Sequence, residues 1–408
     1  MPRAVRLEDF DIDDLQLEPA AEAECFARLR RESPVHRDAR RGAWWLTRHA
    51  DVRDVSREPA LFSSEPRGPW HPFESRFSMQ AQDGPLHHAL RNVVSRGFTP
   101  RRVAELEPRA RRYADAAIDA LASRGHGDLV QDVAVPVPMR IIADMLGLGG
   151  ADLALFGAWS EAVESLTSGD RRPEPSRLAT CERFAERVRE VVIERRARPQ
   201  EDLISAMLAG SPELLEPFRR DPFPGVVAGD GVMGFIAFLV LAGSETTRHA
   251  IAGGMRALIE HPEERERLRR RPELLPAAVE EILRWVSPVR TMRRTLLRDA
   301  ELRGQKLGAG ESVVMIYASA NRDELVFEAP QRFRIDREPN EHLAFGMGTH
   351  FCLGASLARM EIAVVIGRLL ERLPELALAP GTRPTRAASP IVNGLARMPV
   401  VSGAARAA

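Results

Sequence analysis

Apolar residues recur every three or four positions along most of this chain, the spacing typical of amphipathic helices. The clearest case follows residue 352, where LGASLARMEIAVVIGRLLERL repeats apolar residues with a helical period. Alternation typical of strands is confined to short stretches, WWLT at residues 44–47 and the segment 293–323. Further helices are predicted around residues 20–33, 49–58, 106–123 and 182–198, and from residue 83. The pattern predicts a mainly α-helical protein with a smaller β-rich region.

The longest predicted helix runs from about residue 230 to residue 260, where a His-Pro pair ends it. Such a helix is on the order of 45 Å long, enough to cross a whole domain. Its first half, VMGFIAFLVLA, is apolar on all sides and should be buried. AGSETT follows at residues 242–247; its small residues let a flat ligand approach, and its hydroxyls can bond back to carbonyls and bend the helix. The segment is either a site with buried polar groups or an ordinary polar kink.

The composition indicates one large, electrically neutral domain spanning residues 1–408. The chain is 44% hydrophobic with 58 basic and 58 acidic residues, and no low-complexity linker divides it. Zero net charge gives no reason to expect a nucleic-acid partner. The acidic N-terminus lacks a signal peptide, and the longest apolar run has about 11 residues where roughly 20 span a bilayer. Three widely spaced cysteines fit reduced thiols, so we expect a cytoplasmic protein. We also expect that it has no membrane anchor and that it is a monomer.

Candidate chemistry is concentrated in HLAFGMGTHFCLG, at residues 342–354. Its closely spaced glycines suit turns and allow the backbone to approach a flat group. Cys352 stands just before a predicted helix, whose dipole favours the thiolate, the form that ligates metal. Three other interpretations remain open: a small buried hydrophobe, a nucleophile, or a zinc site with His342 and His350 that would need a further ligand.

Six residues of this segment resemble the haem-binding loop of the cytochrome P450 superfamily, FxxGxxxCxG: Phe345, Gly346, Gly348, His350, Cys352 and Gly354. The resemblance implies that Cys352 is the proximal ligand of a haem b iron. It implies that Phe345, Gly346 and His350 also contact the haem. It further implies the P450 fold, with the haem between two helices.

Three more segments resemble motifs of the same family. DGPLHHALR resembles DPPxHxxxR, with Gly84 replacing the first proline, and implies that His87 and Arg91 bind haem propionates; as a bare i,i+4 pair they would suit a solvated face. AGSETT resembles AGx(D/E)TT, which implies that Ala242 lies against the haem. In that motif Thr246 assists oxygen activation and Glu245 belongs to the route that delivers protons.

The third segment contains Glu281 and Arg284, three positions apart. Alone, the pair would suit a surface contact of a few tenths of a kcal/mol. It resembles the family's ExxR motif, which implies a buried structural network that supports the haem loop. Arg294 stands where the family has another propionate ligand, although the adjacent Arg293 leaves an ambiguity of one residue.

The resemblance implies a monooxygenase that uses O2 and takes electrons from a separate ferredoxin, reduced by an NAD(P)H-dependent ferredoxin reductase. The partner should dock on the Cys352 side of the haem, where Arg101 and Arg102 could supply positive charge. The alternatives are a peroxygenase or a non-catalytic haem-binding protein. The presence of Glu245 and Thr246 argues against both, because neither needs a route that protonates oxygen.

The family's pocket positions correspond here to largely apolar residues, so a lipophilic small-molecule substrate is expected. These positions are Trp70, Met79, Phe238, Ala242, Val289, Met292, Ile391 and Val392. The wider sequence resembles bacterial members that hydroxylate steroid side chains, branched lipids and fatty acids. Terpenoid- or macrolide-oxidising members of secondary metabolism are the alternative.

Overall fold

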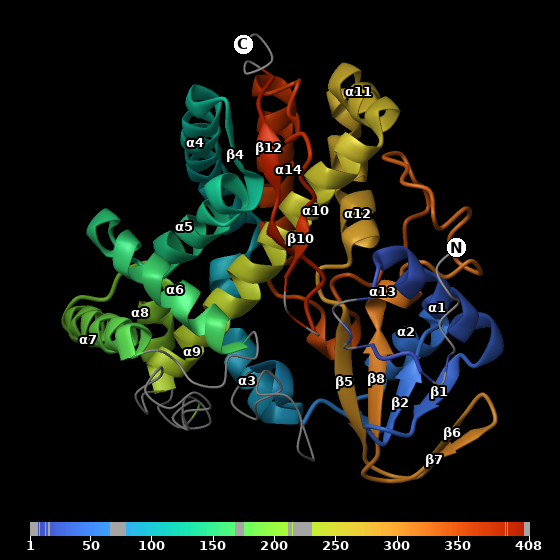
Figure 1. Ribbon diagram of the computed structural model, residues 1–408. Helices are drawn as coiled ribbons and strands as arrows, with labels where there is room; N and C mark the ends of the chain where they lie inside the picture. The colour runs from blue at the N-terminus through green and yellow to red at the C-terminus, as the bar shows by residue number, and fades with distance from the viewer. Residues whose placement is uncertain are drawn as a thin grey trace. The chain divides into compact units, whose positions relative to one another are not determined.

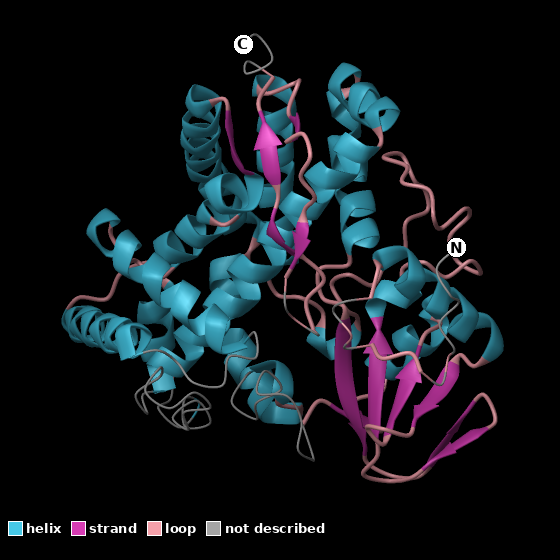
Figure 2. Cartoon of the chain, in the orientation of Figure 1, coloured by secondary structure: helices cyan, strands magenta, loops and turns pink. Residues whose placement is uncertain are grey.

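In the computed structural model, helices predominate and strands are short (Figures 1 and 2). The structure describes residues 7, 9–12, 14, 17–65, 79–167, 175–210, 214, 231–387, 389 and 391–403. The predicted fold class, mainly α with a smaller β-rich region, is confirmed. The chain forms two compact units: the first comprises residues 1–67, 249–352 and 376–399, and the second 68–248, 353–375 and 400–408.

The first unit contains a five-stranded sheet with the order β1-β2-β8-β5-β3. Its strands are β1 Val35–Asp38, β2 Ala43–Leu46, β3 Phe62–Ser63, β5 Thr291–Leu296 and β8 Ser312–Ile316. β2 and β8 run parallel, and every residue of both is buried, as expected for central strands covered on two faces. β2 confirms the strand predicted from WWLT.

Short hairpins and helices complete the first unit. The hairpins pair β6 Ala300–Leu302 with β7 Gln305–Leu307, and β10 Thr385–Arg386 with β11 Leu395–Arg397. The helices are α1 Pro19–Glu32, α2 His49–Arg57, α11 Pro262–Arg270, α12 Leu275–Val286 and α13 Tyr317–Ala320. The sequence predicts strand-like structure for all of 293–323, and α13 shows that this prediction is wrong for Tyr317–Ala320. After the fully buried β8 the chain forms one helical turn, and Tyr317 packs in the same apolar core as Leu46 and Val313.

The second unit is helical in most of its described residues. Its helices are α3 Gly84–Ser95, α4 Pro100–Arg124, α5 Pro136–Met145, α6 Leu153–Thr167, α7 Pro175–Ala197, α8 Leu203–Leu208, α9 Gly231–Val240 and α14 Ala355–Arg372. α4 begins at a Thr99 cap and ends at Gly125, whose φ of +72° is left-handed. α4 and α14 lie side by side (Figure 1), and the Arg368 guanidinium lies 2.6 Å from the Asp115 carboxylate. The remaining strands are β4 His126–Asp128 in the second unit, β9 Ala377–Leu378 in the first unit, and β12 Pro399–Val401, which begins at the last residue of the first unit.

The predicted central helix is interrupted in its middle. α9 is followed by a π-helical turn, Leu241–Glu245, and then by α10 Thr246–Glu260. Three hydroxyls bond back by four residues: Ser244 to Val240 O at 2.7 Å, Thr246 to Ala242 O at 2.9 Å and Thr247 to Gly243 O at 3.1 Å. These side-chain bonds satisfy carbonyls where the ordinary helical ladder is displaced. Within the described ranges, no helix is both long enough and apolar enough to cross a bilayer.

Candidate functional site

The loop that leads to Cys352 folds back on itself around two left-handed glycines. Gly346 has φ +66° and Gly348 has φ +71°. A Cβ on Gly348 would stand 2.4 Å from the carbonyl oxygen of Ser56, so only glycine fits there. The Cys352 amide donates to Phe345 O at 2.9 Å, and the Phe351 amide donates to Gly348 O at 3.0 Å. These bonds hold the backbone on both sides of the cysteine.

Cys352 differs from the other two cysteines in its exposure. Its side chain is exposed and forms no disulfide, whereas Cys25 and Cys181 are buried. Burial raises the pKa of the Cys25 thiol, which disfavours its thiolate. Among the cysteines, Cys352 is therefore the one that an external group can reach, and the interpretation as a buried hydrophobe is wrong.

The zinc interpretation also fails on geometry. The ring of His342 is nearly buried, and its Nε2 lies 3.1 Å from Glu280 Oε2 on α12. Over the part of the chain that the structure describes, no three His, Cys, Asp or Glu side chains are grouped so that they could hold a metal ion. A single thiolate ligand then points to a group that supplies the other ligands of its metal itself.

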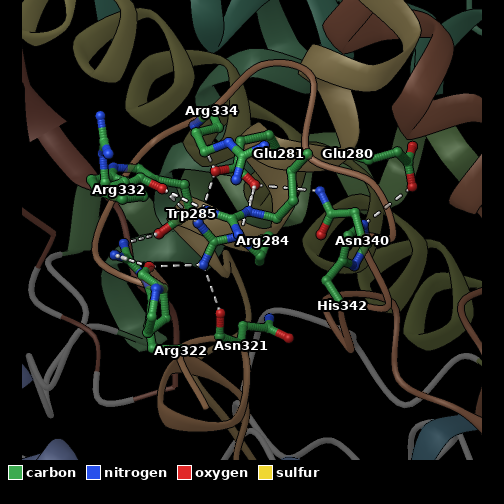
Figure 3. Close-up of polar contacts among 12 residues, drawn as sticks. Glu280, Glu281, Arg284, Trp285, Asn321, Arg322, Arg332, Arg334, Asn340 and His342 are labelled. Atoms are coloured by element: carbon green, nitrogen blue, oxygen red, sulfur yellow. Dashed lines mark hydrogen bonds and ion pairs between the residues drawn. The ribbon is translucent and has the colours of Figure 1, made fainter. Parts of the chain in front are cut away.

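Glu281 and Arg284, both fully buried, form a bidentate ion pair on α12. Arg284 Nε and Nη2 donate to the two Glu281 oxygens at 2.7 and 2.8 Å. Arg284 Nη1 also donates to the carbonyls of Asn321 and Pro330, and Figure 3 shows Arg284 between Glu281 and Asn321. Asn321 Oδ1 accepts from the Leu343 amide at 2.7 Å, so the network extends from α12 into the loop that ends at Cys352.

Sequence reasoning assigned no role to three members of this network. Arg337 Nε donates to Glu281 Oε2 at 3.0 Å, and Asn340 Nδ2 donates to the same oxygen at 3.3 Å. Asn321 lies in ANRD and Arg337 in PQRFRIDR, segments whose family resemblance was visible in the sequence. Their partners could not be predicted because Arg284, which donates to Asn321 O, is 37 positions from Asn321, and Glu281 is 56 positions from Arg337.

The AGSETT segment occupies the π-turn and the start of α10. Ala242 is exposed, Thr246 is partly exposed and Glu245 is 8% exposed. Arg248 Nη2 lies 3.6 Å from Glu245 Oε1, which supplies an opposite charge for this buried carboxylate. The turn therefore presents a small residue and a hydroxyl at its accessible side and keeps its acid covered.

Comparison with known proteins decides the family. The cytochrome P450 family model matches residues 179–393, more than half of the chain. The chain is a cytochrome P450. It is therefore a haem-iron enzyme of the monooxygenase class.

Two of the curated relatives of this P450 are named for a steroid or lipid hydroxylation. A steroid C26-monooxygenase of Mycolicibacterium smegmatis is 39% identical over 386 residues, covering 93% of this chain and 92% of the relative. A methyl-branched lipid omega-hydroxylase of Mycobacterium tuberculosis is 36% identical over 425 residues, covering 98% and 96%. Among solved structures, CYP109E1 from Bacillus megaterium in complex with testosterone has a TM-score of 0.79 at 31% identity, covering 93% and 97%. The hydroxylase HmtN has a TM-score of 0.80 at 33% identity, covering 95% and 97%.

The described residues of this P450 fit a haem ligated by cysteine. The thiol of Cys352 is accessible, and the backbone on its N-terminal side is turned by glycines that carry no Cβ. A flat macrocycle needs such a surface, and the iron needs a sulfur that is not covered by protein. Phe345 and His350 of the same loop are partly exposed.

The predicted propionate ligands lie on two elements, one in each unit. His87 is buried and Arg91 is partly buried on α3, one turn apart. Gly84, at the start of α3, has φ +58°, which a proline cannot adopt, so the departure from the family motif is also a difference in backbone conformation. On β5, Arg294 is 9% exposed. Burial raises the pKa of the Tyr317 phenol, and the positive charge of the nearby Arg294 acts in the opposite direction. The neighbouring Arg293 points to the opposite face of the strand.

The predicted pocket residues are only partly brought together. Val289 and Met292 are half-buried against the apolar core of the first unit, and Val289 forms an antiparallel bridge with Val392. The amide of Arg290 donates to Ile391 O at 2.7 Å, so these two segments form one wall. In the second unit, Met79 is buried and the ring of Phe238 lies 6.0 Å from that of Phe235. Trp70 lies outside the described residues.

Proposed function

We propose that this P450 hydroxylates a lipophilic substrate of the steroid or methyl-branched lipid class, using haem b as its cofactor. The observation that carries the proposal is the similarity, over more than nine-tenths of the chain, to steroid C26-monooxygenases and methyl-branched lipid omega-hydroxylases. The apolar wall formed by Val289, Met292, Ile391 and Val392 supports it, because an apolar surface favours a lipophilic ligand.

Each predicted site residue then has a role. Bound haem supplies the iron at which O2 is activated. Cys352 Sγ would hold the iron, Phe345 and Gly346 of the same loop would pack beside the haem, and Ala242 would leave room for the flat ring. His87, Arg91 and Arg294 would donate to the propionates, since charge-assisted bonds to carboxylates are strong, and His350 would contact the haem. The Thr246 hydroxyl donates to Ala242 O, so its oxygen would accept a hydrogen bond at the oxygen-binding side, and Glu245 would belong to the route that delivers protons.

Substrate class is tested by titrating the ferric protein with a steroid, a methyl-branched fatty acid, a terpene and a macrolide. Substrates that displace water near the iron shift the Soret band, which gives a dissociation constant for each compound. We expect the steroid or the branched fatty acid to bind most tightly. A matched variant, Val392→Ala, should weaken that binding, whereas Ile193→Ala on the exposed face of α7 should not. A spectral shift with the macrolide alone would support the secondary-metabolism alternative. Structural similarity to a mutant of P450 EryK in complex with erythromycin B is the observation that favours this alternative.

Oxygen activation is tested with Thr246→Ala. We expect electron consumption to continue while product falls and released peroxide rises, because the hydroxyl that assists protonation is lost. Ser244→Ala is the matched control, since Ser244 makes the same kind of bond to a carbonyl four residues earlier. Unchanged coupling in Thr246→Ala would favour the peroxygenase or the non-catalytic alternative.

We infer that electrons come from a small ferredoxin and its NAD(P)H-dependent reductase. Both arginines contact carboxylates of this chain: Arg101 lies 3.2 Å from Glu105, and Arg102 pairs with Glu105 and Glu201. Arg101 on α4 is nevertheless 90% exposed, so its guanidinium can also meet an acidic partner. Reduction by a ferredoxin should slow as salt rises, and more so for the native protein than for Arg101→Gln. Rates that do not respond to ionic strength would rule out this electrostatic docking.

A further inference from the structure

Arg290 is a buried arginine in the apolar wall, and the proposed reaction gives it no role. It stands between Val289 and strand β5 and is 1% exposed. Its amide donates to Ile391 O at 2.7 Å, and its carbonyl oxygen accepts from the Ala318 amide at 3.3 Å. The backbone of Arg290 is therefore part of the wall. Its charged side chain requires partners of its own, because an unpaired buried charge is expensive.

The guanidinium of Arg290 binds the N-terminal part of the chain. Nη1 donates to the carbonyl oxygen of Ile12, and Nη2 pairs with Glu22 Oε1 on α1. Phe26 lies one turn further along α1, and its ring centre is 5.9 Å from the same guanidinium, within the range of a cation–π contact. Glu22 and Phe26 share one face of α1 because they are four positions apart. This face of α1 is therefore attached to the wall through the Arg290 side chain.

The Glu22 carboxylate also binds a second arginine. Arg386 on β10 donates from Nη2 to Glu22 Oε2 at 3.2 Å, and from Nη1 to Leu17 O at 3.2 Å. Each oxygen of Glu22 thus has a guanidinium of its own, and charge-assisted bonds of this kind are strong. Arg290 belongs to one of the two segments that form the wall, and Arg386 stands a few positions before Ile391 in the other. Glu22 therefore joins both segments to α1.

We propose that Arg290 and Glu22 are positioning residues that set the substrate specificity of the apolar wall. A wall that is held in one position distinguishes a methyl-branched chain from a straight chain, because a single methyl or methylene group in an apolar pocket changes discrimination by about tenfold or more. A wall that can move accepts both. The choice of these ligands rests on the proposed function, whereas the attachment of the wall to α1 does not.

Arg30 offers a matched control on the same helix. It is 2% exposed, pairs with Glu324 at 2.9 Å and donates to Ser319 O at 3.2 Å. Neither partner belongs to the wall. Arg290→Met and Arg30→Met should both lower stability, since each leaves a carboxylate without a buried partner. Any effect that only Arg290→Met produces is therefore more than a loss of stability.

Amide hydrogen exchange of the haem-loaded, substrate-free protein tests the attachment without using activity. Peptides covering residues 391–394 should exchange about fivefold faster in Arg290→Met and in Glu22→Ala than in the native protein, the effect of one ordinary hydrogen bond. Arg30→Met should leave their exchange unchanged. The double variant of Glu22 and Arg290 should be no faster than Arg290→Met, because the two residues act through one ion pair. Equal acceleration in Arg30→Met, or additive effects in the double variant, would overturn the attachment.

Specificity is tested by titrating the ferric protein with a methyl-branched fatty acid and with a straight-chain fatty acid of the same length. The ratio of the two dissociation constants should fall about tenfold in Arg290→Met and Glu22→Ala, and should stay at the native value in Arg30→Met. Faster exchange with an unchanged ratio would overturn the specificity role. If Arg290→Met does not fold, Glu22→Ala decides, since this side chain is 13% exposed. A native protein that responds only to a macrolide would refute the proposed function, while the exchange of 391–394 would still decide the attachment.

Discussion

The residue type at single positions of the Cys352 loop is restricted both by the local backbone conformation and by contacts with residues far away along the chain. The density of glycines predicted turns in this loop, and Gly348 has the left-handed φ of +71° that such turns need. The sequence could not predict that Gly348 also lies against Ser56, almost 300 positions earlier, because that contact depends on how α2 packs beside the loop.

Gly348→Ala should lower the free energy of unfolding by at least about 2 kcal/mol, since the strain of a left-handed alanine adds to a clash with the Ser56 carbonyl. Gly310→Ala is the control: its φ is +85°, but a Cβ there would meet nothing within 4 Å. It should lose only about 1 kcal/mol. Denaturant unfolding measures both values, and equal losses would show that the contact with Ser56 does not matter.

The Glu281–Arg284 pair shows why spacing alone cannot assign a role. Glu266 and Arg269 on α11 have the same Glu-x-x-Arg spacing and lie 2.6 Å apart, yet both are exposed. The first pair is fully buried and bonded on all sides. The spacing is the same in both pairs, so the buried role of Glu281 and Arg284 could be expected only from their resemblance to the ExxR motif.

Arg284→Ala should destabilise the protein by about 3–5 kcal/mol, because it leaves the Glu281 carboxylate buried without its main partner. Arg269→Ala should change stability by less than about 1 kcal/mol. Thermal and denaturant unfolding of the two variants compares a buried and a surface pair of identical spacing. A loss below about 1 kcal/mol in Arg284→Ala would contradict the structural role given to the network.

At the scale of elements, hydrophobic period predicted most helices and the one central strand that it singled out. It did not predict the π-turn at Leu241–Glu245 or the short helix α13. Both depend on contacts that periodicity does not encode, namely hydroxyl-to-carbonyl bonds in the first case and packing of Tyr317 in the second. Hydrophobic period also does not predict how closely two helices approach, although a glycine within a helix indicates where a close approach is possible.

α10 and α12 approach closely at Gly254, where a Cβ would stand 2.6 Å from Ile282 Cγ2. Gly254→Ala should therefore destabilise by roughly 1–3 kcal/mol through overpacking, against the usual helical gain from alanine. Gly157→Ala on α6, where the nearest atom is the flexible end of Met139 at 3.4 Å, should be neutral or stabilising by up to about 1 kcal/mol. Stabilisation of both variants in urea unfolding would mean that α10 and α12 can separate at little cost.

At the scale of the whole molecule, the family can be predicted from motifs that the sequence displays in order. The topology of the chain cannot be predicted from those motifs. The pairing of β2 with β8 joins residues about 270 positions apart, and each compact unit is built from three separate segments. Such long-range pairings are decided by the complete core. Substrate class is even harder to predict from the sequence than topology, because the pocket residues come from different segments and share no local pattern.

The central claim is that Cys352 is the thiolate ligand of the haem iron, and the carbon monoxide difference spectrum of the reduced protein tests it most directly. The native protein should show the red-shifted Soret band that identifies thiolate ligation, and Cys25→Ala and Cys181→Ala should show the same band because those cysteines are buried. Cys352→Ala should lose that band together with most of its bound haem. The same red-shifted band in Cys352→Ala, or its loss in either of the other two variants, would contradict the assignment of the iron ligand.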